Sequence, residues 1–139
     1  MTETRDGKKP FKRDPEKEME IRRESRRQRA IERLGCCNPV CVVCGENDPL
    51  VLEKHHLEGQ TFGNTLVIVC RNCHRKLSDR QKDHPEKIGE PPDKLEATAH
   101  YLLGRADLSE QLAKQDRVFA KQLLDRADPN RDNLPEEKL

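Results

Sequence analysis

The stretch CVVCGENDPLVLEKHHLEGQTFGNTLVIVCRNCH, residues 41–74, decides the fold of this chain. It begins with the pair Cys41 and Cys44 and ends with the pair Cys70 and Cys73 before His74, each pair in a Cys-x-x-Cys turn. Such a turn lets two thiolates reach one ion about 2.3 Å away, and two turns complete a tetrahedron. Four sulfur ligands leave no position open for a substrate, so we predict a structural zinc ion on these cysteines.

Two other interpretations of the four cysteines stay open. A cluster of buried free thiols would need no metal, and a rubredoxin-like site would hold iron, for which the turn ending in Cys44-Gly45 is suitable. Cys36 and Cys37 precede the first pair and are interpreted as spare thiols, although Cys37 could replace Cys41 as a ligand.

Three histidines lie between and directly after the cysteine pairs: His55, His56 and His74. Neighbouring side chains on a strand point to opposite faces, so one of the adjacent pair could bind a metal while the other faces a water molecule. One histidine base and one divalent ion can together activate water and stabilise the departing oxygen in phosphodiester hydrolysis. We therefore predict a second, open metal site, with a structural histidine pair as the alternative.

Residues 41–80 resemble the HNH endonuclease family, whose ββα-metal core is often braced by a four-cysteine zinc. The resemblance implies a small α+β fold with a zinc-braced ββα-metal core and flanking α-helices. It also implies metal-dependent hydrolysis of DNA phosphodiester bonds that leaves 5′-phosphate and 3′-hydroxyl ends. The motifs that carry it are Cys41-Val-Val-Cys44-Gly45, Leu52-Glu-Lys-His55-His56-Leu57-Glu58-Gly59 and Asn64-Thr-Leu-Val-Ile-Val-Cys70-Arg-Asn-Cys73-His74-Arg-Lys.

The resemblance also implies roles for individual residues. His55 and His74 would be the protein ligands of a catalytic divalent ion such as Mg²⁺ or Mn²⁺. His56 would be the general base, and Asn64 would be the asparagine that orients its loop. An ordinary loop position is the alternative for Asn64.

Two positions depart from the family pattern. The family asparagine usually stands where this chain has Thr65, and a third metal ligand often stands where it has Ser78. Water and phosphate oxygens would then complete the coordination shell of the ion. Arg71, Arg75 and Lys76 are expected to contact DNA phosphates and to position the duplex without reading its sequence.

Composition argues against a large apolar core. The chain has 139 residues, of which 38 % are charged and only 32 % hydrophobic, with no tryptophan. A single small module held by metal and flanked by charged helices fits such a sequence. The net charge of +1 identifies no partner, but residues 71–82 contain five basic side chains and one acidic side chain.

The order of the chain predicts five segments: a basic N-terminal extension at 1–35 that is helical from about 15, the HNH-like domain at 36–84, a Pro-rich linker at 85–93, a C-terminal helical segment at 94–127 and a disordered tail at 128–139. Within the domain we expect strands at 40–43, 50–56 and 66–69 and a helix at 74–82. Gly104 is expected to interrupt the C-terminal segment, giving a broken helix or a helical hairpin.

DNA is the expected partner, with RNA as an alternative. The polar start and the lack of a long apolar run predict a cytoplasmic protein without a membrane partner. The apolar pattern over 95–124 predicts packing, either within the chain or in self-association. Two other functions stay open: a non-catalytic zinc-stabilised nucleic-acid-binding module, and an adaptor that uses 95–124. His84 and His100 are interpreted as bystanders.

Overall fold

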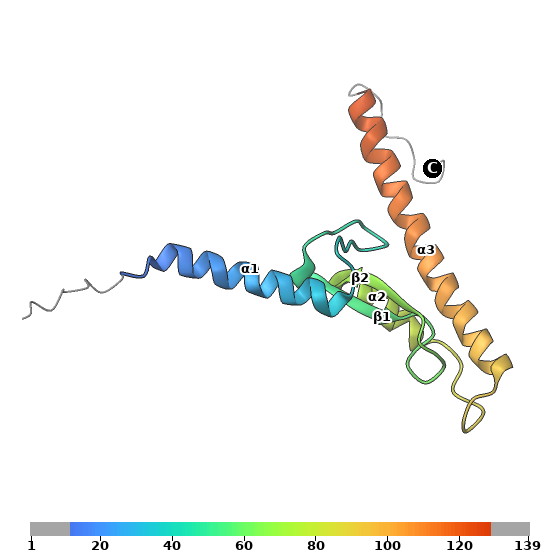
Figure 1. The fold of residues 1–139 in the computed structure, drawn as a ribbon. Coiled ribbons are helices and arrows are strands. Elements are labelled where there is room, and N and C mark those ends of the chain that lie inside the picture. Colours follow the sequence, from blue (N-terminus) through green and yellow to red (C-terminus); the bar gives the residue numbers. More distant parts are fainter. Residues whose placement is uncertain (1–11, 129–139) are drawn as a thin grey trace, which may run out of the picture.

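The computed structural model describes residues 12–128. Within them the chain forms three α-helices and one two-stranded antiparallel sheet, which confirms the predicted small α+β class (Figure 1). Most of the N-terminal extension before residue 15 and of the predicted disordered tail lies outside the described residues. Across 12–128, no helix combines the length and the apolar composition that a membrane crossing requires.

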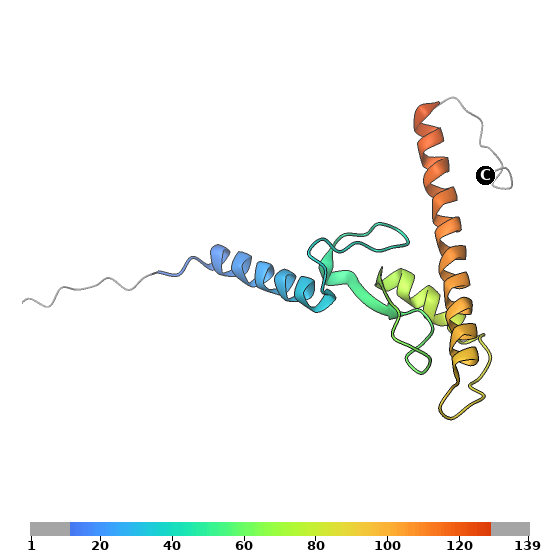
Figure 2. The same cartoon turned by 45° about the vertical axis from the view of Figure 1, so that its right-hand side comes forward.

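The first helix, α1, spans Pro15–Leu34, as its sequence predicts. Asp14 caps it by accepting a hydrogen bond from the backbone N–H of Glu16, and Gly35 ends it with a φ of 69°. Only Ala30 and Leu34 are buried, so the helix contacts the rest of the fold through its last turns alone. It extends away from the sheet on the side opposite to α3 in both ribbon views (Figure 2).

The sheet pairs β1, Leu52–His56, with β2, Leu66–Cys70. The register sets Leu52 opposite Cys70 and His55 opposite Val67. The helix α2, Arg71–Gln81, follows β2 without a break and contacts both strands. The core that these elements enclose is small and includes three of the four paired cysteines. Its buried members are Leu34, Cys41, Val43, Leu52, Val69, Cys70, Cys73 and Leu77.

The strand predicted at 40–43 is wrong. The segment curls into a turn in which the Gly45 N–H donates to the Cys41 carbonyl at 2.9 Å. An extended strand would point alternate side chains to opposite faces, whereas the turn brings the thiols of Cys41 and Cys44 to the same side. One hydrogen bond, from the Val42 N–H to the Ile68 carbonyl, connects the turn to β2.

Two element starts differ from the sequence prediction. A short 3₁₀ turn, Pro49–Val51, occupies the expected start of the first core strand, because the Asp48 side chain accepts from the Leu50 N–H. The helix expected from 74 begins three residues earlier, because the Cys70 side chain caps it.

The helix α3, Lys94–Ala127, is a single continuous helix, so the predicted interruption at Gly104 is wrong. Gly104 is buried where α3 crosses the chain just after β1. A Cβ atom placed there would lie 1.8 Å from the Leu57 carbonyl oxygen. The glycine therefore allows the close approach of helix and loop instead of breaking the helix.

Candidate metal centre and histidine site

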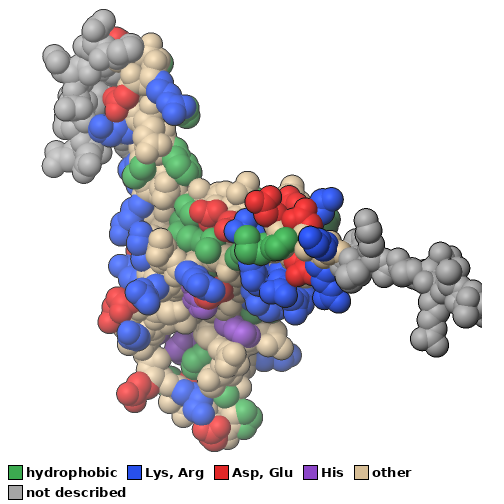
Figure 3. Space-filling view, turned by 90° about the vertical axis from the view of Figure 1, so that its left-hand side faces the viewer, with side chains coloured by type: hydrophobic (Ala, Val, Ile, Leu, Met, Phe, Trp, Pro, Cys, Tyr) green, Lys and Arg blue, Asp and Glu red, His purple; other side chains and the backbone are tan. Residues whose placement is uncertain are grey.

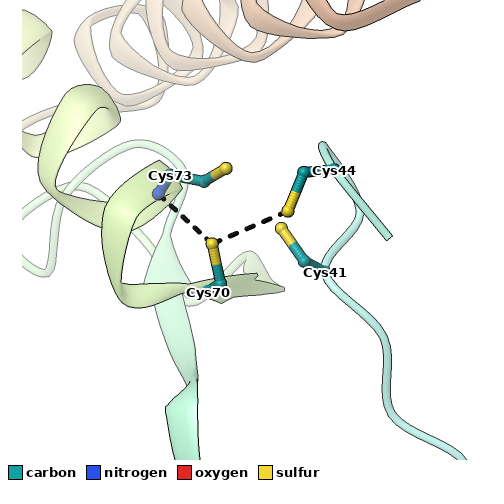
Figure 4. Close-up of side chains that lie close together, drawn as sticks. All are labelled: Cys41, Cys44, Cys70 and Cys73. Atoms are coloured by element: carbon teal, nitrogen blue, oxygen red, sulfur yellow. Dashed lines mark hydrogen bonds between the residues drawn. The ribbon is translucent and has the colours of Figure 1, made fainter. Parts of the chain in front are cut away.

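The thiols of Cys41, Cys44, Cys70 and Cys73 converge on one point (Figure 4). Their sulfur atoms all lie within 4.8 Å of one another, and those of Cys44 and Cys70 are 3.7 Å apart. A tetrahedron with metal–sulfur bonds of about 2.3 Å has edges of about 3.8 Å. The four side chains therefore fit a closed tetrahedral metal site and could hold a zinc ion.

The two cysteine pairs come from different parts of the fold. Cys41 and Cys44 lie in the turn after α1, where the Cys41 N–H donates to the Glu46 carbonyl at 2.8 Å. Cys70 ends β2 and Cys73 lies in the first turn of α2, where its N–H donates to the Cys70 sulfur at 3.5 Å. A bound ion would therefore connect the turn to the corner between β2 and α2.

Three of the thiols, those of Cys41, Cys44 and Cys73, differ in how readily they ionise. Burial opposes ionisation of Cys41, but hydrogen bonds from backbone N–H groups, those of Cys44 and Cys70 foremost, outweigh it and lower its pKa to about 7. Burial raises the pKa of Cys44, and burial together with neighbouring thiols raises the pKa of Cys73. Without a cation Cys44 and Cys73 therefore resist ionisation, and a bound divalent metal ion would supply the charge that ionises them.

Cys36 and Cys37 do not join the cluster. Both are exposed. Cys41, and not its alternative Cys37, lies in the cluster with Cys44, Cys70 and Cys73. They lie directly after Gly35, the residue that ends α1.

The histidine site lies where β1 meets α2. The rings of His55 and His74 are 5.0 Å apart, centre to centre, and lie nearly edge to face. Nδ1 of His74 is 2.6 Å from Oε2 of Glu53, whose other oxygen pairs with Arg71. The hydrogen bond from His74 is the main cause that lowers the pKa of Glu53. Glu53 therefore fixes the His74 ring and leaves Nε2 of that ring for another partner.

His55 is kept neutral by its surroundings. It is only 3 % exposed, and this burial, with the charges of His74 and His56, lowers its pKa to about 4. Its Nε2 lies 3.3 Å from the amide nitrogen of Gln81, the last residue of α2. A neutral imidazole is the form that can bind a metal ion.

His56 ends β1 and begins the loop that joins the two strands. Gln81 donates to the backbone carbonyls of His56 and Leu57, at 2.8 Å and 3.1 Å. These bonds hold the start of the loop against the end of α2. The His56 side chain is half-buried. Because His56 directly follows His55 in the strand, the two side chains lie on opposite faces of β1.

Glu58 fixes the far side of the same loop. Its Oε1 accepts from the Thr65 N–H at 3.0 Å, while the Leu57 N–H donates to the Thr65 carbonyl at 2.9 Å. Glu58 is 6 % exposed, and its Oε2 is buried without a hydrogen-bond partner among the described residues. Asn64, the predicted loop-orienting residue, is exposed next to Thr65.

Three residues of this site were missed by sequence reasoning: Glu53, Glu58 and Gln81. Two of them carry a periodic signal. Glu53 lies two residues before His55 and so on the same face of the strand, and Gln81 lies seven residues after His74 on the same face of the helix. Glu58 carries no such signal, because its partner lies across a loop.

A wide, open groove of about 950 Å³ runs beside His74. It is lined by Arg71, Arg75 and Lys76, the three predicted phosphate contacts, and also by Lys82. The space-filling view shows Lys and Arg side chains gathered around exposed histidine surface on one face of the molecule (Figure 3). The other lining residues are Glu53, Asn72, His74, Ser78 and Asp79.

The two remaining histidines lie apart from this groove and make packing contacts. His84 Nε2 is 2.7 Å from an oxygen of Asp107, and the buried His100 ring stacks on Phe62 with a centroid distance of 3.6 Å. Both contacts connect α3 to the rest of the fold. No protein-family model, curated protein or solved structure matches the chain.

Proposed function

We propose that this protein is a metal-dependent endonuclease that hydrolyses DNA phosphodiester bonds on a ββα-metal core of the HNH type. The observation that carries the proposal is the pairing of a buried, neutral His55 with a His74 ring fixed by Glu53. The two rings lie 5.0 Å apart and His74 borders the basic groove, so the pair could hold a divalent ion, with water and phosphate oxygens as its other ligands.

In this proposal each residue has a distinct task. His55 and His74 hold a divalent ion such as Mg²⁺ or Mn²⁺, which when bound stabilises charge on the scissile phosphate and the departing 3′ oxygen. His56 takes the proton from the attacking water as general base. Asn64 orients the loop that carries His56, beside the Glu58 hydrogen bond to Thr65.

The proposed DNA contacts lie along α2. Arg71, Arg75 and Lys76 line the groove next to His74 and would hold phosphates on either side of the scissile bond. The charge of Arg71 is partly offset by its pairing with Glu53 at 3.3 Å. The zinc proposed on the four cysteines would have a structural role, because it fixes the corner from which α2 begins.

The alternative is a non-catalytic zinc-stabilised nucleic-acid-binding module of the same fold. One observation favours it: Ser78 lines the groove at the position of the usual third ligand, so two protein ligands alone would hold the ion. A weakly held ion would still leave the basic groove able to bind DNA.

A plasmid-nicking assay on zinc-loaded protein separates the two functions. We expect supercoiled DNA to be converted to the nicked circle when Mg²⁺ or Mn²⁺ is added and to stay intact when the added ion is omitted. Absence of nicking with every divalent ion, together with salt-sensitive DNA binding, would support the binding module and contradict the nuclease.

A further inference from the structure

The side of α3 that faces away from the core carries a regular row of small residues. Five alanines follow one another at intervals of seven residues: Ala99, Ala106, Ala113, Ala120 and Ala127. At about 100° per residue this row forms one continuous stripe that drifts by about 20° per heptad. His100, Gly104 and Leu108, which pack against the rest of the fold, lie on the other side of the helix.

Exposed leucines border the alanine stripe. Leu102 is 52 % exposed and Leu123 is 64 % exposed, and both lie three residues after an alanine of the row. Between them the surface is hollowed: Ala113, Asp116, Arg117 and Ala120 line a depression of about 330 Å³. A depression between side-chain ridges is the shape into which another helix packs.

We propose that this face of α3 pairs with the same face of a second copy of the chain, in an antiparallel arrangement with its two-fold axis at Ala113. The axis then sets Ala106 opposite Ala120 of the partner subunit and Ala99 opposite Ala127 of the partner subunit. Alanine at each contact lets the two helices approach closely along the whole stripe.

The residues that border the stripe are complementary under the same symmetry. In an antiparallel pair, the row of residues along each border of the stripe faces the same row of the partner subunit, which runs in the opposite direction. On one border Leu103 meets Leu124 of the partner subunit, and Glu110 meets Arg117 of the partner subunit. Glu110 also binds Arg80 within its own chain through Oε2, and Arg117 also has a partner within its own chain. The contact between subunits would therefore use Oε1 of Glu110 and a second N–H of the Arg117 guanidinium, which has five. Opposite charges and apolar groups therefore match in both halves of the pair.

The second border row matches as well. Leu102 meets Leu123 of the partner subunit, and Ser109 meets Asp116 of the partner subunit. A parallel pair would instead set Glu110 against Ser109 of the partner subunit and Arg117 against Asp116 of the partner subunit, so its border contacts would match as well, but it would align the two helix dipoles. Antiparallel dipoles attract at the short distance that alanine allows, which favours the antiparallel pair.

The sequence pattern and the exposed face thus point to self-association through α3, independently of the proposed nuclease chemistry. Because the stripe lies opposite the core-facing side of α3, pairing leaves both sheets and both histidine sites on the outside of the dimer. Because the pattern is complementary to itself, the expected occupant of this face of α3 is a second copy of the chain.

Sedimentation of the full chain measures its oligomeric state and so tests whether this face of α3 forms a dimer. We expect wild-type protein to form a species of twice the 16.1 kDa chain mass. Ala113→Glu sets two carboxylates against each other at the axis, so it is expected to weaken association about 100-fold. Gln122→Glu adds the same charge on an exposed residue away from the stripe and is expected to leave the dimer intact. Helix content by circular dichroism and zinc content report whether each variant is folded.

A wild-type protein that stays monomeric at every concentration would overturn the proposal, as would a dimer that Ala113→Glu leaves unchanged. Cross-linking tests the direction in a background with Cys36→Ser and Cys37→Ser. We expect a disulfide between Ala106→Cys and Ala120→Cys chains when the two are mixed, and none in Ala106→Cys alone. The reverse result would show a parallel pair and overturn the antiparallel arrangement.

Discussion

Two glutamates hold the histidine site from different sides. Glu53 lies on β1 and fixes the His74 ring through a 2.6 Å contact with Nδ1. Glu58 lies in the loop after β1 and fixes the Thr65 backbone at 3.0 Å. Neither glutamate would touch the reacting atoms, so both act by positioning histidines. Such positioning groups often decide how well a metal ligand or base performs.

At Glu58 the hydrogen bond to Thr65 can be tested by substitution. Glu58→Ala leaves the Thr65 N–H without its partner, and we expect a loss of about 1–3 kcal/mol in the free energy of unfolding. Glu58→Gln keeps a carbonyl oxygen as acceptor and is expected to retain most of that stability. Asn64 is exposed, so Asn64→Ala is expected to change stability by less than about 0.5 kcal/mol. Urea denaturation measures all three, and a larger loss for Asn64→Ala than for Glu58→Ala would contradict this assignment.

Gly104 provides a second test at the scale of one residue. Glycine to alanine inside a helix normally adds about 1 kcal/mol of stability. Here the new methyl group would lie 1.8 Å from the Leu57 carbonyl oxygen, which is backbone and cannot rotate away. We therefore expect Gly104→Ala to lower the free energy of unfolding by about 1–3 kcal/mol. Gln122→Ala, at an exposed position of α3 outside the proposed dimer contact, is the control, and a stabilised Gly104→Ala would refute the close contact.

Among the elements, α2 connects the two sites. It begins directly after Cys70, which belongs to the cysteine cluster and caps the helix, and it ends at Gln81, which holds the histidine loop. His74 lies in its first turn, directly after Cys73. Any shift of the corner between β2 and α2 would therefore move the proposed metal ligand.

Cysteine substitution tests this connection. Cys70→Ser removes one of the four clustered thiols and alters the cap of α2. We expect the variant to bind no zinc and to show a weaker helical signal in circular dichroism. Cys36→Ser, at an exposed thiol outside the cluster, is expected to keep one zinc ion per chain. Elemental analysis and circular dichroism provide the readouts. Full zinc content in Cys70→Ser would rule out the four-cysteine site, and iron in place of zinc would indicate the rubredoxin-like alternative.

The groove along α2 can be tested separately from catalysis. Lys76→Ala removes one proposed phosphate contact, so it should weaken binding to all DNA sequences alike and reduce the salt dependence of log K by about one unit. Lys114→Ala, on an exposed position of α3, is the matched control. Equal effects of the two substitutions on DNA affinity measured over a salt series would argue against a binding groove on α2.

The elements that the sequence predicted well are those with local signals. The caps of α1, the β-branched run before Cys70 and the helical spacing after Asp93 are each contained within a few residues. The segment at 40–43 has the apolar composition of a strand, but two thiols that converge on one point require a turn, and this requirement decides its structure. The contacts of Glu58, Gln81 and Gly104 could not be predicted, because each depends on a segment distant in the chain or across a loop.

The whole molecule depends on a core that is small for its length. Three cluster cysteines form part of this core, so a bound metal ion would stabilise the same region as the apolar packing does. β1 and α2, which carry the three histidines, both pack on it, while α1 and α3 extend away on opposite sides (Figure 1). The proposed active site therefore requires the metal centre, whereas the distal turns of α1 and α3 can serve other partners.

The proposal of a histidine-dependent nuclease is tested by single-turnover cleavage of DNA with His56→Ala. Both proteins are zinc-loaded and assayed with saturating Mg²⁺ or Mn²⁺, and Gln60→Ala in the same loop is the control. We predict a cleavage rate about 10²–10⁴-fold lower for His56→Ala, because a general base contributes that much, with unchanged DNA affinity. Cleavage by His56→Ala at the wild-type rate would contradict His56 as the base and the proposed site with it.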